Sequence, residues 1–400
     1  MDVFYFETMN RNNENYTFLY VTLGLLTAFG PFVTDFYLPA LPLLAEYFST
    51  TASMAQMSLT TGMLGLAVGQ ILIGPLSDRY GRRLPLLLSM AAFIVATVAC
   101  IYSPGIVVFN AMRFFQGLTA AGGIVIARSV ATDLYTGNEL TRFIAVMSAV
   151  NGVAPVVSPV IGGFLLEFTS WIGTFVVLLA VGVLLGAMSS QVRESLPVER
   201  RSTKGLVATF ATYAKVLRNP KYDAFLAAFA MSMFVLFGYI SSSPFVLQKG
   251  FGLSPMAFSL CFAANAVAIA IGCAAAGKVR NEYAGLRTGG VLFVAVAVAV
   301  AAALIARSSI WIVEPAYMAL MFLFGFLQPA LTAIVLDSER ENAGTASAAL
   351  GASGFLFGSI ASPASGIGDV FIASSAIIVG GAVLTALCIF YACRRFARNS

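Results

Sequence analysis

Long apolar stretches, separated by short groups of charged and turn-forming residues, run along the whole chain of 400 residues. Each is close to the length of about 20 residues that crosses the apolar core of a bilayer. A lone strand cannot pair its backbone there, so every stretch is predicted to be a helix. The pattern therefore predicts an all-α membrane protein with twelve spans. Their predicted limits are 17–44, 54–76, 84–101, 106–134, 140–166, 172–190, 222–247, 255–276, 286–306, 313–336, 344–366 and 370–392.

Composition agrees with this pattern and excludes several classes of protein. Hydrophobic residues make up 59% of the chain and charged residues 10%, whereas soluble domains carry roughly 25% charged residues. The chain has no histidine, which excludes a Ser-His triad and a histidine metal site. Any proton chemistry must fall to carboxylates, lysine, tyrosine or cysteine. The five cysteines form no CxxC pair and are expected to pack among helices, so no metal site is expected. Without histidine or a clustered nucleophile–base pair, an enzyme is not expected either.

The distribution of basic residues predicts the orientation of the spans. With both termini inside, nearly all of the 23 lysine and arginine residues fall in inside segments, as the positive-inside rule requires. Only Lys249 and Arg307 fall in outside loops, and Arg113 lies within a span. This accounts for the net charge of +5 without a nucleic-acid partner. A bacterial inner membrane protein with cytoplasmic termini is expected.

The chain is predicted to divide into two bundles of six helices. Residues 1–190 form the first and 221–400 the second, joined by a linker at 191–220 that carries a predicted amphipathic helix. Three features recur about 204 residues apart, in matching spans, and they indicate a duplicated six-helix unit. The pairs are Ser158-Pro159 with Ser362-Pro363, Gly74 with Gly277, and Pro39 with Pro244.

Two ionisable residues inside spans carry the main functional expectation. Asp35 lies in the first span, where a carboxylate is costly and should face a water-filled cavity or the protein interior. Burial disfavours its charged form and a nearby cation favours it, so Asp35 is the leading candidate proton carrier. Arg113 lies at a similar depth in the fourth span, to within about one turn. Pairing between the two is therefore possible; the alternatives are a fixed salt bridge for Asp35 and contacts of Arg113 with backbone carbonyls.

Two further motifs stand out, one in a loop and one in the fifth span. The loop between the second and third spans has an aspartate between two glycines and several arginines, with Gly81 placed to permit a turn. The fifth span carries small residues and prolines, which favour close helix packing. The loop residues are Gly74, Asp78, Arg79, Gly81 and Arg82, and the packing residues are Gly152, Pro155, Pro159, Gly162 and Gly163.

The loop 74–83 resembles the loop signature of the major facilitator superfamily, and segments 113–117 and 152–163 resemble its fourth- and fifth-span motifs. The first-span run from Thr34 to Pro42 is similar to the Bcr/CflA branch of drug:proton antiporters. The resemblance covers the whole chain. It implies export of drugs such as chloramphenicol or bicyclomycin, driven by the proton-motive force without a cofactor. It assigns protonation to Asp35, a structural and electrostatic role to Arg113, and a conformational latch to Asp78 and the loop arginines.

A drug pocket needs aromatic and flexible apolar walls with few polar groups. Transport of a sugar, amino acid or dipeptide is the alternative, although few mid-span amide and acidic groups are present to bind such a metabolite. Asp223 and Glu314 lie near span ends and are expected to contact headgroups or water. The expected partners are small drugs, protons and membrane lipid, and the chain is expected to be a monomer. The predicted pocket residues are Asp35, Tyr37, Met147, Asn151, Leu236, Tyr239, Ile240 and Phe355.

Overall fold

The computed structural model describes residues 13–135, 137–201, 211, 213–339 and 342–396. Within its helices, the side chains at 13–16, 137, 138, 141, 142, 144, 145, 148, 149, 151, 152, 343 and 344 are not described. Much of the amphipathic helix predicted in the linker therefore lies outside the described residues. The described residues form helices and loops with no strand.

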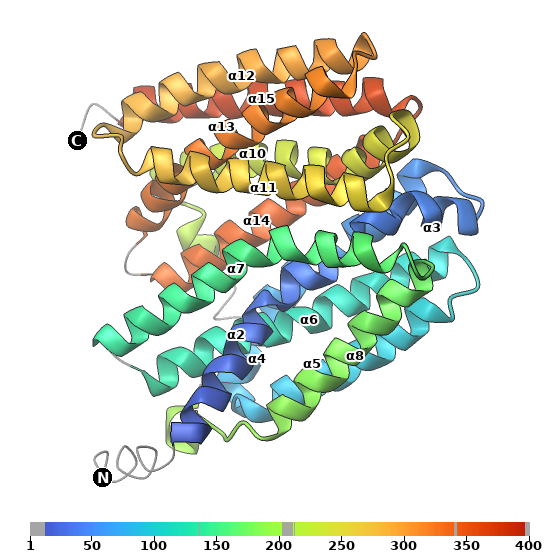
Figure 1. The fold of residues 1–400 in the computed structure, drawn as a ribbon. Helices are drawn as coiled ribbons and strands as arrows, with labels where there is room; N and C mark the ends of the chain where they lie inside the picture. Colours follow the sequence, from blue (N-terminus) through green and yellow to red (C-terminus); the bar gives the residue numbers. More distant parts are fainter. Residues whose placement is uncertain (1–12, 136, 202–210, 212, 340–341, 397–400) are drawn as a thin grey trace.

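The first part of the chain forms α2 to α8 and the last part α10 to α15 (Figure 1). The first-part elements are α2 (Asn13–Asp35), η1 (Leu38–Ala40), α3 (Leu41–Tyr47), α4 (Ala52–Tyr80), α5 (Arg83–Ile101), α6 (Ile106–Leu134), α7 (Gly137–Leu165), α8 (Trp171–Ser190) and η2 (Val198–Arg200). The last-part elements are α10 (Pro220–Pro244), η3 (Phe245–Gly250), α11 (Pro255–Ala276), α12 (Glu282–Ile305), α13 (Ile310–Asp337), α14 (Ala343–Ala364) and α15 (Val370–Phe396).

The predicted all-helical membrane fold is confirmed. Among the described residues, 11 helices are long and apolar enough to cross a membrane, and α7 adds the apolar run Val153–Leu165 within its 29 residues. The predicted limits of the spans at 106–134 and 255–276 coincide with α6 and α11. Figure 1 shows α2 and α4 to α8 gathered beside α10 to α15, with the start of α2 and the end of α15 on the same side of the molecule.

The first and seventh spans are not continuous α-helices. Helix α2 ends at Asp35, and the chain passes through a turn and the short helix η1 before α3 begins. Pro39 lies in η1, where its missing N–H and fixed ring prevent an α-helix from continuing. In the seventh span, α10 ends at Pro244 and continues as the π-helix η3. These are the two prolines that the internal repeat pairs, so both halves break their first span at the same place.

Small residues set the closest helix crossings in each half. A Cβ atom on Gly117 would overlap the carbonyl oxygen of Gly62, where α6 crosses α4. In the second half, a Cβ atom on Gly325 would overlap the carbonyl oxygen of Ile269, where α13 crosses α11. Glycine lets the two backbones of each pair approach this closely. The fourth and tenth spans therefore occupy equivalent positions in the two halves.

Hydrogen bonds join the two halves at the end of the molecule away from loop 81–83. The Gln56 side chain donates to the carbonyl oxygen of Ser241 at 2.9 Å, and Thr60 donates to that of Ser359 at 3.0 Å. Gln248 donates to the carbonyl oxygen of Pro39 at 3.0 Å. Gln56 and Thr60 belong to the first turns of α4, whose opposite end leads into loop 81–83. We call these cross-half contacts the seal, because they hold the two halves together at this end of the molecule.

Candidate functional site

A cavity of about 650 Å³ lies between the two halves. Its wall is mostly apolar and aromatic, with a few polar side chains among these groups. Helices α2, α4, α6 and α7 contribute from the first half, and α10, α11, α13 and α14 from the second. Its aromatic residues are Phe229, Phe237, Tyr239, Phe262, Phe324 and Phe355, and its longer polar and charged residues are Asp35, Gln70, Arg128, Asn265 and Gln328.

Asp35 lines this cavity at the point where the first span breaks. It is the last residue of α2, and its exposed fraction is 6%. No ion pair joins it to a basic residue of the part of the chain that the structure describes. The carboxylate thus borders the cavity without a fixed cation, which is the environment that allows a change of protonation.

Arg113 is fully buried beside the same helix break, but it contacts backbone rather than the Asp35 carboxylate. Its guanidinium donates a hydrogen bond of 3.0 Å to the carbonyl oxygen of Val33 and another to the side chain of Gln116. The guanidinium carbon lies 4.3 Å from the centre of the Tyr37 ring. Arg113 therefore holds both sides of the break, the end of α2 and the turn after it.

The structure places the predicted pocket residues in two groups. Leu236, Tyr239, Ile240 and Phe355 line the cavity together with Asp35. Tyr37 and Met147 are buried and do not line it: Tyr37 packs beneath Arg113, and its hydroxyl lies 3.0 Å from that of Ser58. The side chain at the predicted position 151 lies outside the described residues.

Sequence reasoning missed Arg128 as a cavity residue. Because it lies near the cytoplasmic end of the fourth span, the sequence indicated only a basic residue that follows the positive-inside rule. In the structure, Arg128 lines the cavity from α6. Hydropathy cannot separate these two cases, because an arginine near a helix end is compatible with either the membrane surface or a cavity mouth. Arg128 gives the cavity a positive group in addition to the Asp35 carboxylate.

Glu314 lies elsewhere than predicted. The sequence places it near a span end, facing headgroups or water, but it packs inside the second half. Its Oε1 accepts a hydrogen bond of 2.6 Å from Asn265, and its Oε2 is buried without a hydrogen-bond partner. The sequence correctly placed Glu314 near the start of α13. It did not show which face of α13 carries Glu314, because hydropathy does not report which face of a helix packs against another helix.

The predicted latch residues Asp78 and Arg82 do come together. The Arg82 guanidinium contacts the Asp78 carboxylate at 2.5 Å and the Asp133 carboxylate at 2.9 Å, and it donates to the hydroxyl of Ser77. Arg82 therefore ties the end of α4 to the end of α6. Arg79 takes no part in this network; its guanidinium lies over the ring of Tyr80. A Cβ atom on Gly74 would meet only the Val125 side chain, at 3.6 Å.

Glu194, which sequence reasoning missed, binds the same loop from the segment after α8. It accepts hydrogen bonds from the backbone N–H groups of Arg82 at 2.7 Å and of Arg83 at 3.2 Å. Burial acts to raise the pKa of Glu194, but these hydrogen bonds, with one from Leu196 and the charge of Arg201, hold it below its ordinary value. Gly81 has φ of +90°, and a Cβ atom there would overlap Glu194.

The small residues of α7 allow two close approaches. A Cβ atom on Gly162 would overlap the carbonyl oxygen of Phe36, at the break after α2. A Cβ atom on Gly163 would overlap the Ser259 side chain of α11, in the other half. Pro155 lines the cavity, and Pro159 lies within the same helix. The surroundings of Gly152 are not described.

A helical membrane protein with a sealed end, a cavity between two halves and a buried acid at a broken helix has the architecture of a transporter. The profile of the Major Facilitator Superfamily matches residues 23–363, and the chain belongs to this family. It is a multi-pass membrane transporter rather than an enzyme.

Several relatives are named as transporters or resistance proteins. The "Uncharacterized MFS-type transporter YdgK" of Bacillus subtilis is 33% identical over 92% of this chain and 93% of its own length. The "Chloramphenicol resistance protein" of Pseudomonas aeruginosa is 27% identical over 80% and 74%. The "Bicyclomycin resistance protein homolog" of Haemophilus influenzae is 27% identical over 64% and 65%.

Among solved structures, the chain resembles a bacterial homolog of the human lysosomal transporter Spinster. The TM-score is 0.77 at 17% identity, over 97% of this chain and 98% of that one. At this identity the likeness concerns the fold alone.

Proposed function

We propose that this transporter exports amphipathic drugs, such as chloramphenicol or bicyclomycin, in exchange for protons. Asp35 carries the proposal: it borders a mostly apolar cavity, at a helix break, with no cation paired to it in the described part of the chain. The names of the resistance relatives support the choice of substrate class. The proposed location is a bacterial inner membrane, with both termini cytoplasmic.

In the proposed cycle, Asp35 alternates between two states. Protonated, it carries the proton; ionised, it allows drug to bind in the cavity. The cavity wall supplies apolar contact through groups such as Phe237 and Phe355, which an amphipathic drug requires. Opening of the seal then exposes the site to the outside, where a new proton binds Asp35 and drug leaves. The halves that move are residues 1–190 and 221–400, joined by the linker.

The proposed role of Arg113 is positional. Because its guanidinium binds the Val33 carbonyl and lies over Tyr37, it keeps the break open and the Asp35 side chain at the cavity. The proposed role of the Arg82 network is to hold the loop side of the first half in one arrangement while the seal is closed. In both proposed roles the arginine positions other groups, and Asp35 binds the proton.

Proton-coupled transport of a small metabolite is the other candidate. The cavity amides of Gln70, Asn265 and Gln328 favour it, because they could bind hydroxyl or amide groups of a sugar or dipeptide. The cavity wall contains more aromatic side chains than amides, and this composition favours an amphipathic drug over a sugar or dipeptide.

Proton release from purified protein in weakly buffered detergent tests the proposal. Adding chloramphenicol or bicyclomycin is expected to release protons from the wild type and none from Asp35→Asn. Release on adding sugars or dipeptides, and none with drugs, would favour the metabolite transporter. Equal release from wild type and Asp35→Asn would contradict the role of Asp35.

A further inference from the structure

Glu314 is a second carboxylate inside the membrane, on the other half of the molecule. Its Oε1 accepts a hydrogen bond of 2.6 Å from Asn265 Nδ2, while its Oε2 is buried and has no donor among the described residues. No ion pair joins Glu314 to a basic residue within the described ranges. A proton on Oε2 would remove the charge and turn an unpaired acceptor into a donor, so this site has room for one proton.

Among the described residues, the recorded neighbours of Glu314 are two tyrosines, an asparagine and a cysteine, none of which carries a positive charge. From α10 it meets Tyr239, from α11 Asn265 and Cys261, and on its own helix Tyr317, which lies one turn further along. The hydroxyl groups of Tyr239 and Tyr317 are buried, that of Tyr239 beside Asn265 and that of Tyr317 beside Ser374. Their rings pack edge to face, with centroids 5.0 Å apart. The cluster is polar and largely buried, and Glu314 Oε2 is the acceptor in it that lacks a donor among the described residues.

This cluster touches the cavity wall. Tyr239 and Asn265 both line the cavity, and Glu314 lies directly behind Asn265. A change in the charge of Glu314 therefore acts on two side chains that a bound molecule would meet.

The internal repeat gives the cluster a counterpart in the first half. At the offset of 204 residues between the Ser-Pro pairs, Asp35 corresponds to Tyr239 and Arg113 to Tyr317. Helices α6 and α13 begin at Ile106 and Ile310, the same offset apart. Glu314 thus lies next to the position that mirrors the Asp35 and Arg113 site.

We infer that Glu314 is a second proton-binding group, coupled to the cavity through Asn265 and Tyr239. The inference rests on the proposed proton exchange: it adds one proton to the cycle, taken up and released by the second half, while Asp35 serves the first. Both groups bind and release their protons reversibly, and no other bond is made or broken.

Infrared difference titration of the purified protein tests this without any drug. The C=O stretch of protonated carboxyl groups is recorded as the pH is raised, in wild type, Glu314→Gln, Asp35→Asn and Asp223→Asn. Glutamine keeps the hydrogen bond from Asn265, so the fold is preserved. Glu314→Gln is expected to lose one buried carboxyl band that Asp35→Asn retains. Asp223, an exposed residue in the first turn of α10, provides the matched control and should leave that band unchanged.

Proton counts then place the group in the cycle. In proteoliposomes, Glu314→Gln is expected to lower the number of protons exchanged per drug by one, while drug transport continues. A wild-type band pattern in Glu314→Gln would overturn the inference and leave the role of Asp35 intact. Loss of the band with an unchanged proton count would also overturn it. A failure of drug-induced proton release in the wild type would instead contradict the proposed function.

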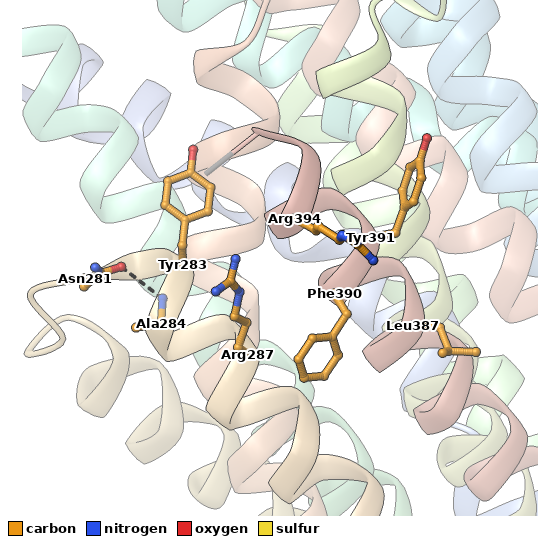
Figure 2. Close-up of a pocket in the computed structure, with 8 residues that line it drawn as sticks. All are labelled: Asn281, Tyr283, Ala284, Arg287, Leu387, Phe390, Tyr391 and Arg394. Carbon is orange, nitrogen blue, oxygen red and sulfur yellow. Dashed lines mark hydrogen bonds between the residues drawn. The ribbon is translucent and has the colours of Figure 1, made fainter. Parts of the chain in front are cut away.

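A second, independent observation concerns the surface between α12 and α15. A pocket of about 830 Å³ opens there, next to the loop before α12 (Figure 2). Arg287 lies on α12 and Arg394 on α15, and neither forms an ion pair with a carboxylate of the described residues. Leu387 and Phe390 complete the wall and are 59% and 42% exposed. The pocket thus joins two guanidinium groups that have no carboxylate partner among the described residues to an apolar surface; that of Arg287 also lies beside the thiol of Cys393.

We propose that this pocket binds the phosphate of an anionic phospholipid, with the acyl chains along Leu387 and Phe390. A guanidinium group can donate two parallel hydrogen bonds to two oxygens of one phosphate. Basic pockets between membrane helices on the cytoplasmic side bind such headgroups. The pocket lies at the end of α15 where Arg394 and Arg395 follow each other, which the charge distribution assigns to the cytoplasmic leaflet.

Lipid titration of purified protein, followed by thermal unfolding, tests this site. Phosphatidylglycerol or cardiolipin is expected to raise the unfolding temperature, and phosphatidylcholine is not. Substituting Gln for Arg287 or Arg394 should weaken the response about fivefold per arginine. Arg200→Gln removes a charge from the linker and should leave it unchanged. An equal response to inorganic phosphate would assign the site to free anions, and equal responses to all lipids would overturn the proposal.

Discussion

The Arg113 guanidinium donates a hydrogen bond of 3.0 Å to the carbonyl oxygen of Val33, two residues before the proposed proton carrier. The depth of Arg113 predicted from the sequence was compatible with a direct pair with Asp35, and the structure shows a contact with the backbone beside it. A carbonyl at a helix end needs a donor that the broken helix no longer supplies. Arg113 supplies it from the fourth span, and Tyr37 packs against the same guanidinium.

The shape of the Arg113 side chain therefore matters as much as its charge. Lysine keeps the charge but lacks the planar fork that reaches Val33 and Gln116 together while lying on Tyr37. Arg113→Lys is expected to lower drug transport at least about tenfold, as the loss of a hydrogen bond to a charged group predicts. Transport assays in vesicles measure this. Arg307→Lys, at an exposed ion pair with Asp369, is the matched control and should be neutral. Wild-type transport by Arg113→Lys would contradict the positional role.

Gly81 is predicted to be intolerant of a side chain. Its φ of +90° is unfavourable for other residues, and a Cβ atom would overlap Glu194. Gly81→Ala is expected to destabilise the protein by about 1–3 kcal/mol, seen as a lower unfolding temperature in detergent. Gly74→Ala is the control, because its Cβ atom would meet only Val125 at 3.6 Å. Equal unfolding temperatures for the two variants would show that the loop adapts easily.

Glu194 is predicted to make stability pH-dependent on the acidic side. Its pKa is held below the ordinary value of 4.5, so its ionised form stabilises the folded state. That contribution is complete above 4.5 and is lost as the pH falls through the lower folded-state pKa. The unfolding temperature of Glu194→Gln should therefore lie below that of the wild type at neutral pH, and the two should converge in acid. A constant difference across this range would contradict the assignment.

Phe355 is predicted to contact drug. It lines the cavity and packs on Phe237, with ring centroids 5.9 Å apart. Removing the ring deletes apolar contact worth roughly 1–2 kcal/mol, so Phe355→Ala should raise the drug Kd about tenfold. Phe164→Ala removes a phenylalanine of α7 that is 52% exposed and should leave the Kd unchanged. Fluorescence or calorimetric titration separates the two outcomes, and an unchanged Kd in Phe355→Ala would exclude this contact.

The sequence was sufficient to predict the helices, because apolar length and turn residues determine where a chain can cross a bilayer. It also indicated Asp35, since a lone acid in a span stands out against apolar neighbours. Arg82 and Asp78 were predicted from the loop motif and do meet.

The sequence did not show which face of each helix meets the cavity. Glu314 was assigned to the membrane surface and Tyr37 to the cavity, yet each packs inside one half. A rotation of part of a turn separates these outcomes, and it is set by packing between helices that are distant in sequence. Glu194 and Asp133 were missed for a related reason: their roles arise from contacts with Arg82 that join three separate segments.

Drug transport against a gradient, driven by an imposed pH difference in proteoliposomes, tests the central claim most directly. Wild type and Asp35→Asn are compared both for this uphill transport and for exchange of labelled against unlabelled drug without a pH difference. Asp35→Asn is expected to retain exchange, because the cavity wall is unchanged, and to lose pH-driven accumulation. Accumulation by Asp35→Asn at the wild-type level would show that the proton is carried elsewhere, and the account would be wrong.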